Sequence, residues 1–127
     1  MITVGELMNR ELVTVSGKMS ADYAAKLMSN CKIGSVLVEQ NHHIIGIVTE
    51  SDIVRKVVGA DQTASLLPMD SIMSAPVIGI DERRPITEAA DLMHRNGIRH
   101  LLVRSATTVV GVLSVRDLLR PVSIDDF

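Results

Sequence analysis

The chain repeats itself at a spacing of 65 residues, and this duplication limits the possible folds more than any other feature of the sequence. When the sequence is shifted by 65 positions, 11 of the 48 residues from position 8 to position 55 meet an identical residue, without a gap. Unrelated segments of this composition would share roughly three identities. The matched residues of the first copy are Met8, Ala24, Ala25, Leu27, Met28, Ile33, Leu37, Val38, Gly46, Asp52 and Arg55. The chain therefore contains two copies of one supersecondary unit.

Each copy predicts the same order of elements. For the first copy we expect a helical turn at 4–8, a strand at 12–15, a helix at 20–30, strands at 35–39 and 43–48 joined by a hairpin turn at 40–42, and a helix at 50–58 that ends at Gly59 as its C-cap. The hairpin strands are nearly continuous apolar runs, which is typical of strands covered on both faces. In the second copy Pro85 precedes a helix with one apolar face, on which the adjacent Ala89 and Ala90 would allow close packing.

This order predicts an α+β fold made of two tandem β-α-β-β-α repeats. A unit of about 55 residues buries little surface alone, so we expect the two repeats to share one core about a pseudo-twofold axis. The predicted boundaries are repeat 1 at 1–59, a linker at 60–67, repeat 2 at 68–121 and an acidic tail at 122–127.

Composition excludes several classes of function. The net charge is −2 and only 2% of residues are aromatic, so the chain lacks both the basic field and the stacking surfaces of a nucleic-acid-binding protein. One cysteine permits neither an intrachain disulfide nor a cysteine-rich zinc site, and no metal site is expected. No apolar stretch approaches the roughly 18 residues of a membrane span, and no signal peptide is visible at the start. These features predict a soluble, cytoplasmic protein that is not bound to a membrane.

The most specific pattern is G-x-x-[ST]-x-x-D, which runs from Gly46 to Asp52 and again from Gly111 to Asp117. One interpretation is purely structural, because a hydroxyl and a carboxylate three residues apart also form a capping box at a helix start. The other is a ligand site, in which the helix N-terminus and hydroxyl bind phosphate, the carboxylate accepts from ribose hydroxyls, and the glycine leaves space for a ring. The pattern leaves both interpretations open.

The repeated framework resembles the CBS domain, and two copies in tandem resemble a CBS pair, or Bateman module. The resemblance covers about residues 3 to 121. It rests on Leu7-Met8, Thr14-Val15, Ala24-Ala25-x-Leu27-Met28, Ile33-x-x-Val36-Leu37-Val38 and the segment from Gly46 to Asp52. Such pairs typically bind adenosyl ligands such as AMP, ADP, ATP or S-adenosylmethionine and regulate an attached or separate protein.

The resemblance implies a set of ligand-binding residues. Thr49 and Ser114 would contact phosphate, and Asp52 and Asp117 would hold ribose. The backbone around Thr14, Ile78, Ile33, Gly34, Ser35, Ile98, Arg99 and His100 would line the adenine slot, and Arg116 would also contact phosphate.

The two predicted sites differ in charge. Arg99 and His100 precede the middle strand of the second copy, where the first copy has Gly34 and Ser35. In the family that the chain resembles, basic side chains at this position often reach phosphate, so we expect the two sites to be unequal; the sequence leaves open whether one site or both are occupied.

We expect a stand-alone regulatory module that senses energy state by binding an adenine nucleotide between its repeats, forms a homodimer as a four-repeat disc, and signals to an effector protein. The sequence shows no catalytic constellation, so we expect no enzyme activity and no catalytic cofactor. Two alternatives stay open: a structural dimerisation module whose motifs are only helix caps, and a sensor of a phosphate-free ligand such as S-adenosylmethionine or methylthioadenosine.

Overall fold

A computed structural model describes residues 1–120, and the predicted acidic tail lies outside the described residues. Within this part of the chain the residues divide into two compact units. One unit, which we call the Asp52 unit, is a continuous stretch, 13–77. The other, the Asp117 unit, combines 1–12 with the chain from residue 78 onward. The Asp117 unit therefore takes its first segment from before the Asp52 unit, and the Asp52 unit extends past the end of repeat 1, so units and sequence repeats divide the chain at different places.

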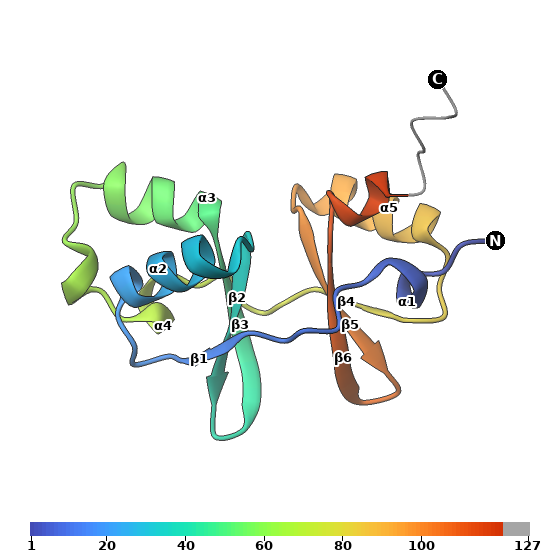
Figure 1. Ribbon diagram of the computed structural model, residues 1–127, viewed down its shortest axis with the longest axis horizontal. Helices are drawn as coiled ribbons and strands as arrows, with labels where there is room; N and C mark the ends of the chain where they lie inside the picture. The colour runs from blue at the N-terminus through green and yellow to red at the C-terminus, as the bar shows by residue number, and fades with distance from the viewer. Residues whose placement is uncertain (121–127) are drawn as a thin grey trace. The chain divides into compact units, whose positions relative to one another are not determined.

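The Asp52 unit contains a three-stranded sheet in the order β1-β2-β3. Its elements are β1 (Thr14–Ser16), α2 (Ala21–Cys31), β2 (Ser35–Gln40), β3 (His43–Thr49), α3 (Glu50–Asp52), the π-helical segment η1 (Ile53–Val58), the 3-10 turn η2 (Ala64–Leu66) and α4 (Met69–Ile72). Strand β1 is parallel to β2, and β2 and β3 form an antiparallel hairpin. Asn41 and His42 both have positive φ, as a type I′ hairpin turn requires. The helices lie toward the end of the hairpin opposite this turn (Figure 1).

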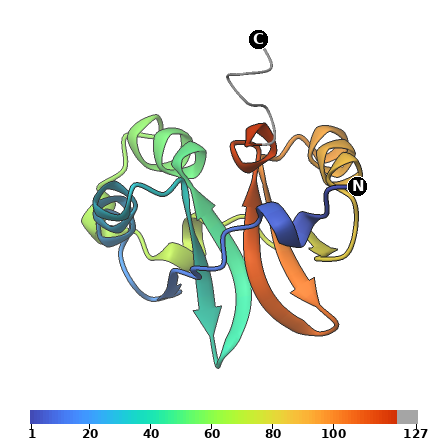
Figure 2. The same cartoon turned by 45° about the vertical axis from the view of Figure 1, so that its right-hand side comes forward.

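The Asp117 unit has the same sheet order, β4-β5-β6. Its elements are α1 (Val4–Leu7), β4 (Gly79–Asp81), α5 (Ile86–Asn96), β5 (His100–Ser105), β6 (Thr108–Ser114) and the 3-10 turn η3 (Asp117–Leu119). Segment 1–12 lies beside β6, where Asn9 and Val112 exchange backbone hydrogen bonds of 2.9 and 3.0 Å (Figures 1 and 2). The α+β fold of two similar repeats is thus confirmed.

The apolar core differs from the prediction of one shared core. The buried apolar residues form two clusters, one inside each unit. The first cluster includes Val15, Met28, Val36, Val38, Val48 and Met69, and the second includes Val4, Met8, Ile80, Met93, Leu101 and Leu113. Each cluster is completed by a helical turn from the other repeat. Turn α4 completes the cluster of the Asp52 unit, and α1 completes the cluster of the Asp117 unit. Because these turns supply buried Met69 and Val4, a unit of this size can enclose a core of its own.

One local prediction about helices was wrong and another was confirmed. Ala90 is exposed whereas Ala89 is fully buried, because successive residues of a helix lie about 100° apart and the buried face of α5 is narrow. Gly59 ends η1 with φ −66°, and the left-handed conformation appears two residues later at Asp61, with φ 54°. Gly59 is therefore the C-cap, as expected, but it is not in the left-handed conformation that glycine often adopts there.

Candidate functional site

Both copies of the repeated motif form the same capping arrangement at the end of the third strand. In the first copy, Asp52 Oδ2 accepts hydrogen bonds from the Thr49 backbone N–H at 2.9 Å and the Thr49 hydroxyl at 3.1 Å, and the Asp52 N–H approaches Thr49 Oγ1 at 3.3 Å. In the second copy, Ser114 and Asp117 make the corresponding contacts at 2.8, 3.0 and 3.3 Å. The capping geometry is therefore present in both copies, and each carboxylate has one oxygen engaged by its own cap.

The motif glycines make room for methionines, and the prediction that they keep space for a ligand ring was wrong. A Cβ atom on Gly46 would lie 2.5 Å from Met73 Sδ, and one on Gly111 would lie 2.7 Å from Met8 Sδ. These methionines are themselves equivalent at the 65-residue spacing. Each stands at the end of the short helical turn that enters the unit from outside its repeat. The glycine is thus required by close packing within the unit.

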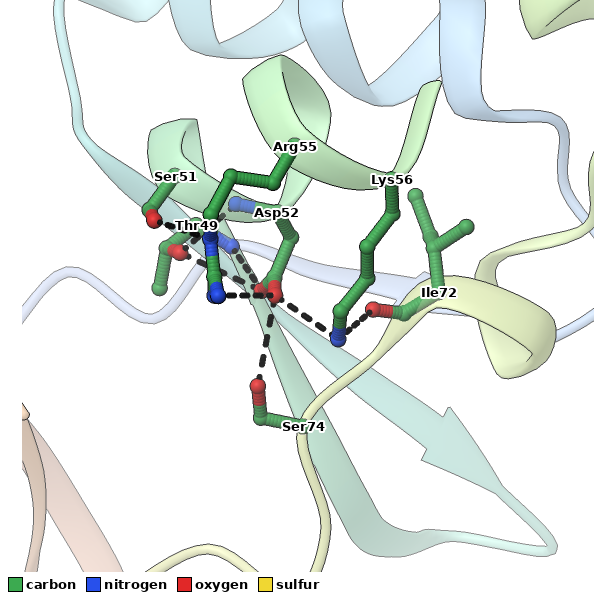
Figure 3. A network of polar contacts seen from close by, with 7 residues as sticks. All are labelled: Thr49, Ser51, Asp52, Arg55, Lys56, Ile72 and Ser74. Carbon is green, nitrogen blue, oxygen red and sulfur yellow. Dashed lines mark hydrogen bonds and ion pairs between the residues drawn. The ribbon is translucent and has the colours of Figure 1, made fainter. Parts of the chain in front are cut away.

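The Asp52 carboxylate is buried and has further partners on its second oxygen (Figure 3). Oδ1 accepts from Lys56 Nζ at 2.9 Å and from Ser74 Oγ at 3.3 Å, and the Arg55 guanidinium lies 4.0 Å away. Lys56 Nζ also donates to the Ile72 carbonyl oxygen at 2.8 Å. The side chain of Asp52 is only 1% exposed. This network joins the motif helix to the chain that follows α4.

The Asp117 carboxylate is more accessible than its counterpart, with 20% of its side chain exposed. Its Oδ1 faces the Arg120 guanidinium at 3.4 Å. Asp117 lies in the wall of a hollow of about 490 Å³, a volume within the usual range for small-molecule sites. The other lining residues are Met8, Asn9, Arg10, Glu11 and Arg120. An accessible carboxylate beside two arginines offers acceptors for hydroxyl groups and donors for an anionic group.

The loop before the middle strand lies next to the motif in both copies. The Val115 N–H donates to the Arg99 carbonyl oxygen at 2.9 Å, and the Glu50 N–H donates to the Gly34 carbonyl oxygen at 3.1 Å. His100 pairs with Ser114 across the β5–β6 ladder, and Ser35 pairs with Thr49 across the β2–β3 ladder. The structure therefore brings together Gly34, Ser35, Thr49 and Asp52 in one unit, and Arg99, His100, Ser114 and Asp117 in the other.

Arg99 and Arg116, the arginines predicted to reach phosphate, differ from most of the other basic side chains in having no polar partner within residues 1–120. Among residues 1–120, the exposed side chains of Arg99 and Arg116 form no hydrogen bond or ion pair, whereas Arg83, Arg84 and Arg95 are each paired with a nearby carboxylate. The chain after Ser114 forms only the turn η3 within the described residues, so any phosphate recognition there depends on side chains more than on a helix dipole.

Of the remaining predicted residues, Thr14 and Ile78 lie on the side of the central strand opposite the motif strand, whereas Ile33 and Ile98 directly precede Gly34 and Arg99. Thr14 belongs to β1, which pairs with the side of β2 opposite to β3, and it lines a separate hollow with Lys18, Glu39 and Asp70. Ile78 accepts a backbone hydrogen bond from Leu102, the residue equivalent to Leu37. The side chains of Ile33, Ile78 and Ile98 are half-buried and pack against the apolar clusters.

Sequence reasoning missed several residues around the motif carboxylates. Lys56, Ser74, Asn9, Arg10 and Arg120 contact or flank the motif carboxylates. One signal was available: at the 65-residue spacing Lys56 is equivalent to Pro121 and Ser74 to Asn9, so the two copies differ at both positions. Ser74 lies near Asp52 because the segment that contains Ser74 belongs to the Asp52 unit, and Asn9 lies near Asp117 because the segment 1–12 belongs to the Asp117 unit.

Comparison with known proteins agrees with the repeated architecture. The family model for the CBS domain matches residues 4–59 and 69–123. An uncharacterized protein of Methanopyrus kandleri is 36% identical over 121 residues, which cover 94% of this chain and 62% of that protein. The chain is thus shorter than this relative by more than a third of the relative's length.

Two solved structures are informative. A protein with CBS domains from Burkholderia ambifaria is similar with a TM-score of 0.92 and 31% identity, over 99% of this chain and 97% of that one. A CBS domain protein from Pyrobaculum aerophilum, complexed with AMP, is similar with a TM-score of 0.82 and 28% identity, over 92% of this chain and 90% of that one. Among the described residues, no helix has the length and apolar character needed to cross a bilayer.

Proposed function

Because the chain belongs to the CBS domain family and carries two copies of the domain, we propose that it is a regulatory module that binds an adenosine-containing ligand of the AMP, ADP or ATP type. The module has no catalytic role of its own. It forms a homodimer and passes the binding signal to a separate effector protein. The AMP complex of the Pyrobaculum aerophilum relative supports the choice of ligand class.

The observation that carries this proposal is the hollow beside Asp117. It combines a partly exposed carboxylate with Arg10 and Arg120, and its volume of about 490 Å³ suits a nucleotide-sized molecule. The carboxylate would accept from ribose hydroxyls on its exposed side, while its other oxygen stays engaged by the Ser114 cap. Charge-assisted hydrogen bonds of this kind are among the stronger polar contacts.

Phosphate recognition is assigned to the unpaired arginines. The Arg99 backbone is fixed next to the motif through Val115, while its side chain is exposed and has no partner among the described residues. A planar, permanently charged guanidinium matches phosphate oxygens better than a lysine does. Ser114, His100 and Arg116 would contribute further contacts, and the backbone at Ile78 and Ile98 would contact the adenine ring.

A second candidate function is a structural dimerisation module, and the two capping boxes favour it. Both motifs are satisfied internally, so their residue types have a structural reason without any ligand. A sensor of S-adenosylmethionine or methylthioadenosine is a variant of the first proposal in which Arg99 is not needed.

Calorimetric titration of AMP and adenosine tests these possibilities, after a thermal-shift screen that also includes ADP, ATP, S-adenosylmethionine and methylthioadenosine. Ligand at a hundred times its Kd should stabilise the fold by about 2.7 kcal/mol. Asp117→Asn should weaken both AMP and adenosine at least about tenfold, because a charged acceptor is lost. Arg99→Ala should weaken AMP by about ten- to a hundredfold and leave adenosine unchanged.

The matched control is Asp91→Asn, which neutralises an exposed carboxylate on α5 that is paired with Arg95. It should leave both affinities unchanged. If Asp117→Asn lowers the melting temperature but not the affinity, the capping function is the correct one. If no adenosyl ligand stabilises the protein, the ligand-binding proposal fails and the structural module takes its place.

A further inference from the structure

The Asp52 carboxylate has no acceptor position left for a ligand. An ionised carboxylate offers about four lone-pair positions. Four donors already point at this one: the Thr49 N–H, the Thr49 hydroxyl, the Ser74 hydroxyl and the Lys56 ammonium. The side chain is also 1% exposed. A ribose hydroxyl could reach it only by displacing one of these donors.

Lys56 is the donor that is most difficult to displace. Its Nζ lies 2.9 Å from Asp52 Oδ1 and 2.8 Å from the Ile72 carbonyl oxygen, so it connects the motif helix to the end of α4 (Figure 3). Removing an ammonium from a buried carboxylate leaves an uncompensated charge inside the protein, which is strongly unfavourable. A neutral hydroxyl from a ligand cannot replace that charge.

Within residues 1–120, the Asp117 motif does not show this arrangement. The residue equivalent to Lys56 is Pro121, which has no charge and no hydrogen-bond donor in its side chain. The residue equivalent to Ser74 is Asn9, whose side-chain oxygen accepts from the Glu11 N–H at 2.9 Å. Asp117 correspondingly keeps 20% of its side chain exposed and lines a hollow.

We propose that Lys56, assisted by Ser74, determines which copy of the motif takes the ligand, by occupying the Asp52 carboxylate and closing that copy. The chain then binds one adenosyl ligand, at the Asp117 copy, and the Asp52 copy serves as an internal ion-pair connection. This inference rests on the proposed function for the identity of the ligand. The ion pair itself can be tested without a ligand.

The ligand-based test is the stoichiometry of adenosine binding, because adenosine has no phosphate that could itself attract Lys56. We expect one equivalent per chain, no change in number or affinity for Asp52→Asn, and at least a tenfold loss for Asp117→Asn. Lys56→Met should add a second, weaker equivalent, with Lys56→Gln as the alternative if the first variant does not fold. Two equivalents in the parent protein, one of them lost in Asp52→Asn, would overturn the inference, as would a folded Lys56 variant that still binds one.

The ligand-free test is chemical labelling of lysine amines. The Lys56 side chain is 37% exposed and doubly bonded, whereas Lys18 is 82% exposed. We expect Lys56 to react at least about tenfold more slowly than Lys18, and Asp52→Asn to accelerate Lys56 while leaving Lys18 unchanged. Equal labelling of the two lysines in the parent would overturn the inference. If no adenosyl ligand binds but Lys56 is protected, the proposed function fails and the ion pair stands.

Discussion

Replacing the motif glycines by alanine should destabilise the protein by a predictable amount in each copy. On Gly46 the added methyl would meet Met73 Sδ at 2.5 Å, Met73 Cγ at 2.9 Å and the Ser74 carbonyl oxygen at 3.0 Å. On Gly111 it would meet Met8 Sδ at 2.7 Å, the Asn9 carbonyl oxygen at 2.8 Å and Met8 Cγ at 3.0 Å. Carbon atoms in good contact lie about 3.5–4.0 Å apart, so a rearrangement is needed at both positions.

The magnitude follows from what has to move. A methionine side chain is flexible and can turn away at the loss of part of its burial, whereas a carbonyl held in a backbone bridge cannot. The Ser74 carbonyl oxygen accepts from the Ile47 N–H at 3.0 Å, and the Asn9 carbonyl oxygen accepts from the Val112 N–H at 3.0 Å. Overpacking typically costs about 1–3 kcal/mol. We expect Gly46→Ala near the lower end of that range and Gly111→Ala near the upper end, since its backbone contact is the tighter one.

Urea unfolding of single and double variants provides the assay. Met73→Ala removes the two closest atoms, so Gly46→Ala should cost little in that background and the double-mutant cycle should give a coupling of about 1 kcal/mol. Met8→Ala should rescue Gly111→Ala only in part, because the Asn9 carbonyl oxygen remains. Strict additivity in both copies, or a cost below about 0.5 kcal/mol for Gly111→Ala, would refute the close-packing explanation.

Two further predictions concern stability and assembly. Lys32 and Gly97 occupy equivalent left-handed positions, with φ 54° and 62°, and nothing lies within 4 Å of a Cβ built on Gly97. In thermal unfolding, Lys32→Gly should therefore stabilise the protein by about 0.5–1 kcal/mol, and Gly97→Ala should destabilise it by about 1 kcal/mol. Two changes of the same sign would contradict this explanation. Val54 and Val58 are 61% and 69% exposed and lie four residues apart on η1, so we expect this apolar face to contribute to the proposed homodimer. Val58→Lys should shift the mass measured by light scattering at tens of micromolar toward that of a monomer. A parent protein that is already monomeric would exclude the homodimer.

Most elements could be predicted from the sequence because they depend on local signals. The apolar run of Val36 to Val38, the hairpin turn at Asn41 and His42, and the helix after Pro85 all form where their patterns indicate. The first strand was expected to begin at residue 12 and begins at Thr14. The difference has a physical cause, because the preceding segment through Leu12 belongs to the Asp117 unit, where Asn9 pairs with Val112.

The candidate site could be predicted only in part. The repeated motif located Thr49, Asp52, Ser114 and Asp117, and the charge difference at Arg99 indicated that the copies are unequal. The additional partners of Asp52 are Lys56 and Ser74, and Ser74 is 22 residues away along the chain. A long-range hydrogen bond of this kind has no periodicity or spacing rule; the 65-residue comparison shows that the copies differ at Ser74 and Asn9 but not which carboxylate these residues approach.

The passage of residues 1–12 into the Asp117 unit affects how this protein can be assembled during synthesis. The ribosome releases Val4 and Met8 first, but the strands they pack against are made last, so one core must wait for nearly the whole chain while the Asp52 unit can close earlier. A cut at 60–67 would separate Gly46 from Met73 and Gly111 from Met8, the methionines that pack against these motif glycines. A circular permutant that starts at residue 13 and joins the end of the chain to Met1 would instead keep both units intact. A single-repeat ancestor would also have needed a helical turn from outside its own repeat to complete its core, and it would have obtained this turn by exchanging first segments with a second copy of itself. Fusion of the two genes would have converted that exchange between two molecules into an exchange within one chain.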